Sequence, residues 1–339
     1  MSDEIAVVGA GRMGEGIALT CLAAGFPVVL ADVKDRTDEE RRAYADRVRA
    51  RLGSGATMCG RETGALAGAS VVFEAVPEVL EIKREALAWV CDEVAADAVI
   101  ASTTSTFLVT EIAALVDRPE RAVNAHWLNP ADVMPLVEVS RSDETDPAAV
   151  SRLTGLLERL GKIPVVCGPA AGYIVPRLQA LVMNEAARMV EEGVASAADI
   201  DLAVRAGLGP RFSVLGPLEF IDWGGGDILY YASRYLAAQL GDRFRHPDVI
   251  EENMAAGRRG LQDGVGFYTF DPDGVAAYRA ARMREFAELF RLREPELRAG
   301  TPVPARFPSG REGHRGGRPS PLHEGDHQPE GEHRRDGRQ

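Results

Sequence analysis

The stretch Glu4-Ile-Ala-Val-Val8, continued by Gly9-Ala-Gly11-Arg-Met-Gly14, decides the fold of the first half of this chain. Its first five residues are a short apolar run, as expected of a strand buried in a parallel sheet. A helix-forming segment follows to about Ala24, and a second strand is predicted from Phe26 to Ala31. Strand, glycine-rich turn, helix and strand, in this order, predict a Rossmann-type α/β domain.

The same stretch predicts a binding site for a dinucleotide. Glycines at a strand-to-helix turn let the backbone approach a pyrophosphate, and the helix N-terminus supplies amide donors. Asp32 ends the second strand, 18 residues after Gly14, where a carboxylate accepts hydrogen bonds from the adenosine ribose. Because a carboxylate there repels a 2′-phosphate, we expect NAD rather than NADP. The residues expected to contact it are Gly9, Gly11, Arg12, Met13, Gly14 and Asp32.

Length and composition exclude several classes of protein. The chain has 339 residues, 45% of them hydrophobic, and a formal net charge of -12. This length predicts two domains, and this charge argues against a nucleic-acid partner and against adhesion to anionic membranes. We expect neither a signal peptide nor a membrane span, since no long apolar run occurs. The four cysteines show no metal spacing and are interpreted as reduced thiols of a cytoplasmic protein.

Polar side chains follow two more predicted strands, at the point where each strand ends. Glu74-Ala-Val-Pro-Glu78 follows a strand at Ser70–Phe73, and Ser102-Thr-Thr-Ser-Thr106 follows one at Ala98–Ser102. Ligands of open α/β sheets bind at the carboxyl ends of the strands. We therefore expect Glu78 and Ser105 at the binding edge, although hydroxyl-rich loops are usually only turns.

His126 is the only histidine in the first 245 residues. Arg121–Ala125 is predicted to be a strand that runs into it, and a second short strand, Pro135–Val139, carries Glu138. A lone buried histidine is more often a satisfied core residue than a catalyst. Two neighbouring strands, however, would bring this carboxylate to the imidazole. A carboxylate fixes the tautomer and stabilises the imidazolium, so that histidine can take a proton from an alcohol.

The middle and the end of the chain show other patterns. Lys34–Leu52 is rich in arginine and acids, which indicates a solvated helix or a phosphate-binding edge, and glycine-rich Gly53–Gly68 is predicted to be a loop. Helical periodicity prevails from about Gly172. The predicted helices there are Ile174–Glu192, Ala197–Ala206, Pro217–Leu240, Pro247–Ala256 and Gly274–Phe290.

We therefore expect an α/β fold class with three parts. Residues 1–170 would form a Rossmann-type NAD-binding domain that carries the catalytic histidine, and residues 171–299 an all-helical domain for substrate binding and dimerisation. Residues 300–339 have almost no large apolar side chains and are predicted to be a disordered polar tail.

In this order the motifs resemble the 3-hydroxyacyl-CoA dehydrogenase family, from about residue 4 to residue 270. Glu74-Ala-Val-Pro-Glu78 with Lys83 is similar to the family's E-A-V-x-E and the lysine after it, which touch the cofactor. Ser102-Thr-Thr-Ser105 stands where the family has S-N-T-S, whose last serine contacts the substrate. His126 and Glu138 match the family's catalytic pair, and Asn129 matches a further cofactor contact.

The resemblance implies an NAD-dependent oxidoreductase of fatty acid metabolism. It would oxidise a 3-hydroxyacyl thioester to the 3-ketoacyl form, or catalyse the reverse reduction. His126 would remove the proton of the 3-hydroxyl group while hydride leaves C3 for the nicotinamide. Glu138 would orient His126, and Ser105 would hydrogen-bond the substrate oxygen.

Three departures from the family pattern concern the substrate. Pro176 stands where the family's G-F-x-x-N-R has an asparagine that helps to hold the substrate carbonyl. Gln262 replaces an expected lysine, and the segment between Asp32 and Val71 lacks the length of the family's helical hairpin, which supplies a lysine for CoA.

Ala206-Gly-Leu-Gly-Pro-Arg211-Phe resembles a subgroup that acts on free hydroxy acids, the L-gulonate and L-carnitine dehydrogenase type. In that subgroup an arginine can pair with a substrate carboxylate, which makes Arg211 a candidate substrate contact beside Ser105 and Pro176. Three alternatives thus stand: a thioester of CoA or a carrier protein, a free 3-hydroxy acid, or an NAD-binding structural or regulatory protein without turnover. The expected macromolecular partner is a second copy, in a homodimer formed through the helical domain.

Overall fold

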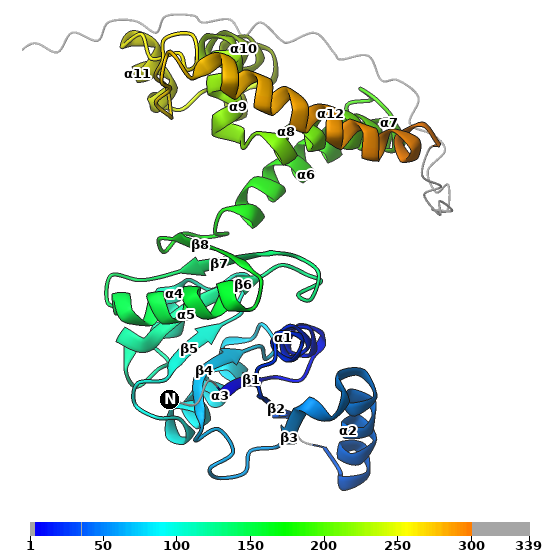
Figure 1. The fold of residues 1–339 in the computed structure, drawn as a ribbon, viewed down its shortest axis with the longest axis vertical. Coiled ribbons are helices and arrows are strands. Elements are labelled where there is room, and N and C mark those ends of the chain that lie inside the picture. Colours follow the sequence, from blue (N-terminus) through cyan, green and yellow to red (C-terminus); the bar gives the residue numbers. More distant parts are fainter. Residues whose placement is uncertain (1–3, 35, 300–339) are drawn as a thin grey trace, which may run out of the picture. The chain divides into compact units, whose positions relative to one another are not determined.

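The computed structural model describes residues 4–34 and 36–299 (Figure 1). The chain divides into two compact units, one ending at Ala197 and the other beginning at Ala198. The tail predicted at residues 300–339 lies outside the described residues.

The first unit is built on one sheet with the strand order β3-β2-β1-β4-β5-β6-β7-β8 in the described part of the chain. β1 (Glu4–Val8) pairs in parallel with β2 (Val28–Ala31) on one side and with β4 (Ala69–Glu74) on the other. α1 (Arg12–Ala23) connects β1 to β2. These strands are buried on both faces, which is why the sequence shows them as continuous apolar runs rather than alternating patterns. The Rossmann-type architecture is confirmed.

α2 (Asp38–Leu52) begins with a capping box. The Thr37 hydroxyl accepts from the Glu40 amide at 3.3 Å, and the Glu40 carboxylate accepts from the Thr37 amide at 2.9 Å. The helix buries only Tyr44, Val48 and Leu52, so most of its arginines face water, as in a solvated helix.

The loop predicted at Gly53–Gly68 is partly wrong, because Ala56–Cys59 form β3. This strand pairs in parallel with β2 and is the edge of the sheet. Four residues flanked by glycines are too few to show a period, and the strand forms because the backbone of β2 offers it hydrogen-bonding partners.

The remaining strands extend the sheet from β4. They are β5 (Val99–Ser102), β6 (Ala122–Trp127), β7 (Leu136–Ser140) and β8 (Ile163–Cys167), and the helices between them are α3 (Leu80–Glu93), α4 (Val109–Ala113) and α5 (Pro147–Arg159). β6 and β7 are antiparallel, and the other neighbours are parallel. α1, α2 and α5 pack on one face of the sheet, and α3 and α4 pack on the other. The carboxyl ends of β1, β2, β4, β5 and β6 therefore meet at one edge.

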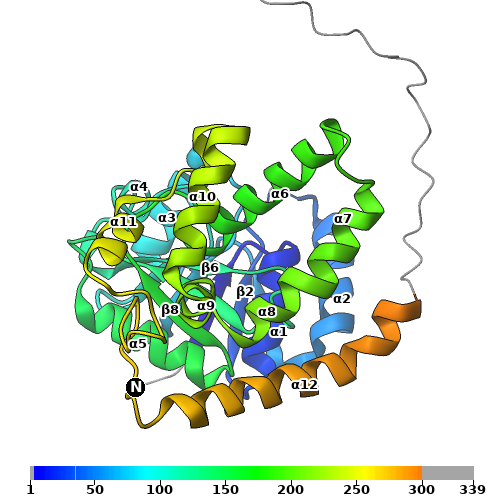
Figure 2. The ribbon, with the colours of Figure 1, turned by 90° about the horizontal axis from the view of Figure 1, so that it is seen from above.

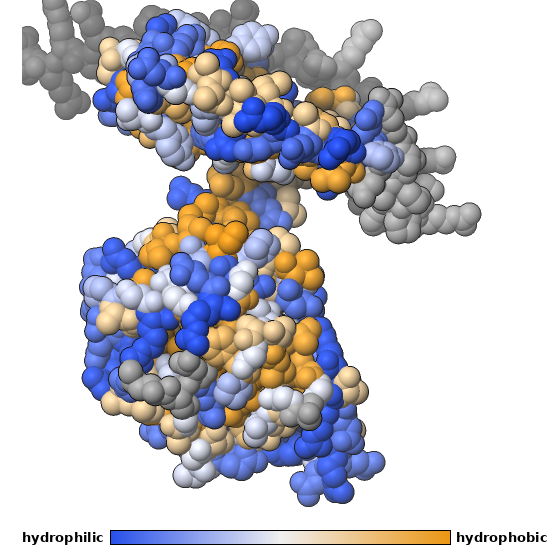
Figure 3. Space-filling view, in the orientation of Figure 1, coloured by the Kyte–Doolittle hydropathy of each residue, from blue (hydrophilic) through white to orange (hydrophobic). Residues whose placement is uncertain are grey.

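α6 (Val175–Glu191) is the last helix of the first unit, and none of its residues is buried. Leu178, Leu181 and Met183 are 47%, 65% and 59% exposed. Apolar side chains also gather where β8 and the start of α6 lie (Figure 3), since Ile163 and Val166 of β8 are exposed as well.

The second unit is helical, as predicted. Its α-helices in the described residues are α7 (Ala197–Ala203), α8 (Gly209–Val214), α9 (Pro217–Gly224), α10 (Gly226–Leu240), α11 (Asp248–Ala255) and α12 (Val275–Ala299). α12 is one long helix that packs against α8 (Figure 2). The single helix predicted at Pro217–Leu240 is wrong, because Gly225 has a φ of 102° that no α-helix contains. No described helix is long and apolar enough to cross a membrane.

Candidate active site

The turn after β1 is shaped by two glycines. Gly9 has a φ of 107°, and a Cβ there would lie 2.5 Å from the carbonyl carbon and oxygen of Ala75. A Cβ on Gly14 would lie 1.9 Å from the carbonyl oxygen of Gly9. Only glycines let α1 start this close to the turn. Its first amides, from Arg12 on, can therefore serve an anion such as a pyrophosphate.

Asp32 follows β2 at the same edge and is 8% exposed. Its Oδ2 lies 2.5 Å from Arg36 Nε, and the Arg36 guanidinium lies 4.4 Å from the centroid of the Tyr44 ring. The Tyr44 hydroxyl donates to the carbonyl oxygen of Ala10, which joins this corner to the glycine turn. Burial, together with the charges of Glu15 and Asp32, raises the pKa of Tyr44 to about 12, so this hydroxyl remains a donor.

Glu74, the last residue of β4, is fully buried and saturated with donors. Lys83 Nζ lies 3.0 and 3.1 Å from its two oxygens, Ser102 Oγ donates at 2.5 Å, and the Val76 amide donates at 2.8 Å. The Lys83 ammonium also lies 3.2 Å from Glu78 Oε2, and its side chain is 1% exposed. The structure thus places Lys83 inside an ionic cluster.

Glu78 holds the loop that carries Ser105. Its Oε1 accepts from the amides of Ser105 and Thr106, each at 2.9 Å, and from the hydroxyls of Thr104 and Thr106. Burial opposes ionisation of this carboxyl, but the two hydroxyls and Lys83 outweigh it and lower the pKa of Glu78 to about 2. An ionised Glu78 therefore fixes the loop, and Ser105 itself is exposed beside it.

His126 and Glu138 face each other across the antiparallel pair of β6 and β7. His126 Nδ1 lies 2.8 Å from Glu138 Oε2, with the side chains 6% and 0% exposed. The expectation that neighbouring strands bring them together is confirmed. Because a carboxylate can only accept, Nδ1 carries the proton in this contact, and Nε2 of a neutral imidazole keeps its lone pair.

The second oxygen of Glu138 is held by backbone that sequence reasoning did not consider. Glu138 Oε1 accepts from the amides of Ile174 and Val175 at 2.8 and 2.9 Å. These amides lie at the N-terminus of α6, where the helix dipole favours a negative charge. Amides carry no side-chain signature, and these two come 36 and 37 residues after Glu138, so the sequence held no signal for the contact.

Tyr173 is a further residue that the sequence analysis missed. Its ring stacks on the His126 imidazole, with the centroids 4.8 Å apart and the planes 10° from parallel. Its hydroxyl donates to the carbonyl oxygen of Thr104 at 2.8 Å and accepts from Asn124 Nδ2 at 3.1 Å. Burial raises the pKa of Tyr173, although the hydrogen bond from Asn124 opposes this. The only available signal was an aromatic residue in the family's G-F-x-x-N-R.

Family profiles match almost all of the described chain. The profile of the 3-hydroxyacyl-CoA dehydrogenase NAD binding domain matches residues 4–170, and that of the 3-hydroxyacyl-CoA dehydrogenase C-terminal domain matches residues 172–270. The chain belongs to the 3-hydroxyacyl-CoA dehydrogenase family. As a member it is an NAD-dependent oxidoreductase, and NAD is the cofactor.

Relatives of full length support this assignment. A 5-formyl-3-hydroxy-2-methylpyridine 4-carboxylate 5-dehydrogenase of Mesorhizobium japonicum is 31% identical over 87% of this chain and 99% of its own length. A probable 3-hydroxyacyl-CoA dehydrogenase of Caenorhabditis elegans is 31% identical over 79% of this chain and 95% of its own. A crystal structure of a 3-hydroxyacyl-CoA dehydrogenase from Archaeoglobus fulgidus has a TM-score of 0.72 and 36% identity, and covers 85% of this chain and 98% of that one.

Two positions depart from the family's sequence pattern, one in α6 and one in the second unit. Pro176 is in the first turn of α6 and offers no side-chain donor. Asn184 lies eight residues further along α6, which is about 12 Å along the helix axis. Gln262, in the second unit, donates to Asp227 Oδ1 at 3.3 Å.

The other predicted contacts are spread over both units. Asn129 is exposed after β6 and precedes a cis peptide bond to Pro130. Gly11 and Arg12 are exposed and Met13 is half-buried, so these three can face a cofactor. Arg211 belongs to α8 of the second unit, where its guanidinium lies 5.6 Å from the centroid of the Phe220 ring.

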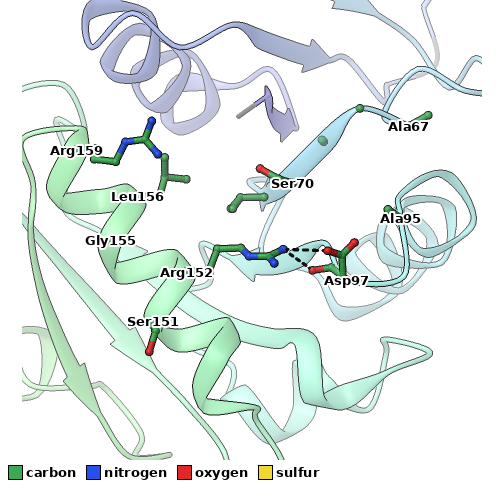
Figure 4. A pocket seen from close by; sticks show the side chains of 12 residues that line it. Ala67, Ser70, Ala95, Asp97, Ser151, Arg152, Gly155, Leu156 and Arg159 are labelled. Atoms are coloured by element: carbon green, nitrogen blue, oxygen red, sulfur yellow. Dashed lines mark hydrogen bonds and ion pairs between the residues drawn. The ribbon is translucent and has the colours of Figure 1, made fainter. Parts of the chain in front are cut away.

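A groove of about 550 Å³ lies elsewhere on the first unit (Figure 4). It is lined by the start of β4, including Ser70, and by Arg152 of α5, whose Nη1 lies 3.5 Å from Asp97 Oδ2. The start of β4 is the end opposite to Glu74, which places this groove at the edge of the sheet away from Ser105. It contains no part of the His126–Glu138 pair.

Proposed function

We propose that this dehydrogenase oxidises the 3-hydroxyl group of a 3-hydroxyacyl thioester to a ketone, or reduces the ketone, with His126 as general base and acid. The observation that carries the proposal is the buried contact of 2.8 Å between His126 Nδ1 and Glu138 Oε2. It leaves Nε2 as the imidazole nitrogen that exchanges a proton with substrate.

Each residue of this edge would have a distinct task. His126 Nε2 takes the hydroxyl proton, and Glu138 stabilises the imidazolium that forms while the amides of Ile174 and Val175 hold the carboxylate in place. Ser105, on the loop fixed by Glu78, donates a hydrogen bond to the substrate oxygen. NAD, when bound, supplies the hydride chemistry.

The residues present fit NAD. The cradle of Gly9, Gly11, Arg12, Met13 and Gly14 is closed to any Cβ at Gly9 and Gly14, and Asp32 offers its carboxylate to the adenosine ribose. Asn129 is a third contact by its match to the family. For Glu78 and Lys83 we propose a role in shaping the cofactor side of the edge, since the Lys83 ammonium is engaged with both glutamates.

A free carboxylic acid is the second candidate substrate, with Arg211 as the residue that would meet its carboxylate. Two observations favour it. The helical hairpin that carries a CoA-binding lysine in the family is here the single helix α2, followed by the edge strand β3. The full-length relative from Mesorhizobium japonicum is named as a dehydrogenase of a pyridine carboxylate. Pro176 also lacks the side-chain donor that the family's asparagine offers to the thioester carbonyl, which leaves a free acid open as the substrate.

The test is the loss of absorbance at 340 nm with purified protein, NADH and acetoacetyl-CoA, with NADPH in a parallel cuvette. Rapid loss with NADH alone is expected. If thioesters are inert while free 3-hydroxybutyrate, L-gulonate or L-carnitine reduces NAD, the free acid is the substrate. If NADH binds and neither class turns over, the protein is an NAD-binding protein without catalysis, and the proposal fails.

We further propose a homodimer, residence in the cytoplasm and a role in fatty acid metabolism. The exposed apolar side chains of α6 in the first unit support the dimer. Independently, so do Ile228, Tyr231 and Tyr235 of α10 in the second unit, which are 64%, 62% and 68% exposed. The four free cysteines support a reducing compartment. Sedimentation velocity tests the dimer: a monomer at micromolar concentration would contradict it.

A further inference from the structure

The segment Gly172–Val175 touches both members of the His126–Glu138 pair. The amides of Ile174 and Val175 donate to Glu138. The side chain of Tyr173 stacks on the His126 imidazole. The mechanism above uses the amides but assigns no task to the tyrosine.

We propose that Tyr173 is a positioning residue that holds the His126 imidazole and the Ser105 loop in one fixed geometry. This rests on the proposed function only in assuming that His126 and Ser105 act on the same substrate oxygen.

The stacked ring restrains the imidazole. The contact to Glu138 fixes only one nitrogen of His126 and leaves the tilt of the imidazole about that hydrogen bond to other contacts. The Tyr173 ring lies nearly parallel to the imidazole, with 4.8 Å between the centroids, and blocks this tilt on one face. The direction in which Nε2 points is thereby restricted. The π face also favours the imidazolium that forms during oxidation.

The hydroxyl ties that ring to the rest of the site. Thr104, whose carbonyl accepts from it at 2.8 Å, precedes Ser105, and Asn124, which donates to it at 3.1 Å, lies two residues before His126 in β6. One phenol therefore joins the Ser105 loop, β6 and the imidazole. The phenylalanine that the family motif has at this position would stack in the same way but would make neither of these two hydrogen bonds.

The backbone of Tyr173 supports a specific role for the side chain. With a φ of 46°, Tyr173 is the only non-glycine residue among the described residues that has a left-handed backbone conformation. Glycine adopts this conformation without strain, whereas other residues keep it only where their surroundings hold them in it. The left-handed turn at Gly172 and Tyr173 also turns the next two amides toward Glu138.

The experiment compares Tyr173→Leu, which removes the stack, with Tyr173→Phe, which removes only the hydroxyl. Phe26→Leu is the matched control, because Phe26 is similarly buried (8% against 6%) and lies before β2 at the opposite edge of the sheet. Three quantities are measured: kcat, KM for NADH, and the tautomer of His126 from ¹⁵N chemical shifts of histidine-labelled protein, assigned with His126→Gln.

We expect Tyr173→Leu to lower kcat by about 10- to 100-fold, as for a small misplacement of a catalytic group, with KM for NADH within about twofold. The His126 signals should change from one tautomer to a mixture, because a tilted imidazole spends part of the time out of contact with Glu138. Tyr173→Phe should keep the tautomer and lower kcat by about threefold. That loss should shrink in a Ser105→Ala background, because the hydroxyl would act through Ser105. Phe26→Leu should lower thermal stability and leave kcat and the tautomer unchanged.

The proposal is overturned if Tyr173→Leu keeps both kcat and the single tautomer, or if Phe26→Leu changes them to the same extent. Should Tyr173→Leu not fold, Tyr173→Phe decides, and strictly additive losses with Ser105→Ala overturn the proposal. If the wild-type protein turns over no substrate, the proposed function fails, while the ¹⁵N tautomer measurement still tests the hold of Tyr173 on His126.

Discussion

Glu74 and Glu138 are both fully buried in the same sheet, yet their partners differ in kind. Glu74 meets the ammonium of Lys83, which Glu74 and Glu78 engage together. Glu138 meets an imidazole, and two backbone amides rather than a cation hold its other oxygen. The first cluster pairs one ammonium with two carboxylates, whereas the second leaves Nε2 of the His126 imidazole outside its contact with Glu138. We propose that burial and pairing alone do not mark a catalytic carboxylate, and that its imidazole partner does.

The largest expected effect comes from removing that imidazole partner. His126→Gln should lower turnover by about 10²- to 10⁴-fold, the usual contribution of a general acid-base group, while NADH binding measured by fluorescence survives. His246→Gln is the control, because His246 is also little exposed and lies 3.5 Å from Glu251. It should leave turnover unchanged. Equal turnover of wild type and His126→Gln would show that the imidazole partner of Glu138 has no part in catalysis.

The next effect falls on stability, at the other carboxylate. Lys83→Met leaves Glu74 charged and buried without its cation, and removal of one partner of a buried ion pair costs about 3–5 kcal/mol. Urea unfolding measures this loss. Adding Glu74→Gln to Lys83→Met should restore much of the stability, since no buried charge then stays unpaired. A Lys83→Met protein as stable as wild type would show that this ionic cluster does not stabilise the fold.

For Glu138→Gln we expect the opposite of Lys83→Met, namely a larger loss of turnover than of stability. The amide keeps the shape of the side chain but lacks the charge that stabilises an imidazolium, so we expect a loss of about 10- to 100-fold in kcat, by analogy with carboxylates that orient metal-bound histidines. Thermal stability should fall less than in Lys83→Met. If stability falls more than turnover, Glu138 belongs with Glu74 as a structural carboxylate.

The smallest effect concerns Glu78, which borders the Glu74 cluster. Its pKa is lowered from an ordinary 4.5 to about 2, so its ionised form stabilises the folded chain above about pH 4.5 and this contribution is lost as the pH falls toward 2. Melting temperatures of wild type and Glu78→Gln should therefore differ at pH 7 and converge between about pH 4.5 and 2. A constant difference over that range would refute the assignment.

Much of the fold and part of the site follow from the sequence. The glycine turn and Asp32 were predictable because each obeys a local rule, and so was the meeting of His126 with Glu138, since short neighbouring strands leave few alternatives. β3 was not predicted because four residues are too few to show a period. The break at Gly225 was not predicted because the sequence does not reveal the φ of a glycine inside an apolar pattern. The ligands of Glu138 and the stack of Tyr173 escaped because backbone amides and a left-handed tyrosine depend on tertiary structure. The burial of Lys83 likewise depends on how α3 packs against β4.

The amides of Ile174 and Val175 limit how this protein can be divided into modules. The two family profiles meet between residues 170 and 172, which invites a cut there for exchanging helical domains between relatives. Such a cut would separate the sheet from the backbone that holds Glu138 and from the ring that covers His126. A chimera joined after the first turn of α6 would carry both along with their sheet. We therefore expect the functional border of the NAD-binding module inside α6, which begins at Val175, rather than at residues 170–172, where the sequence profiles meet.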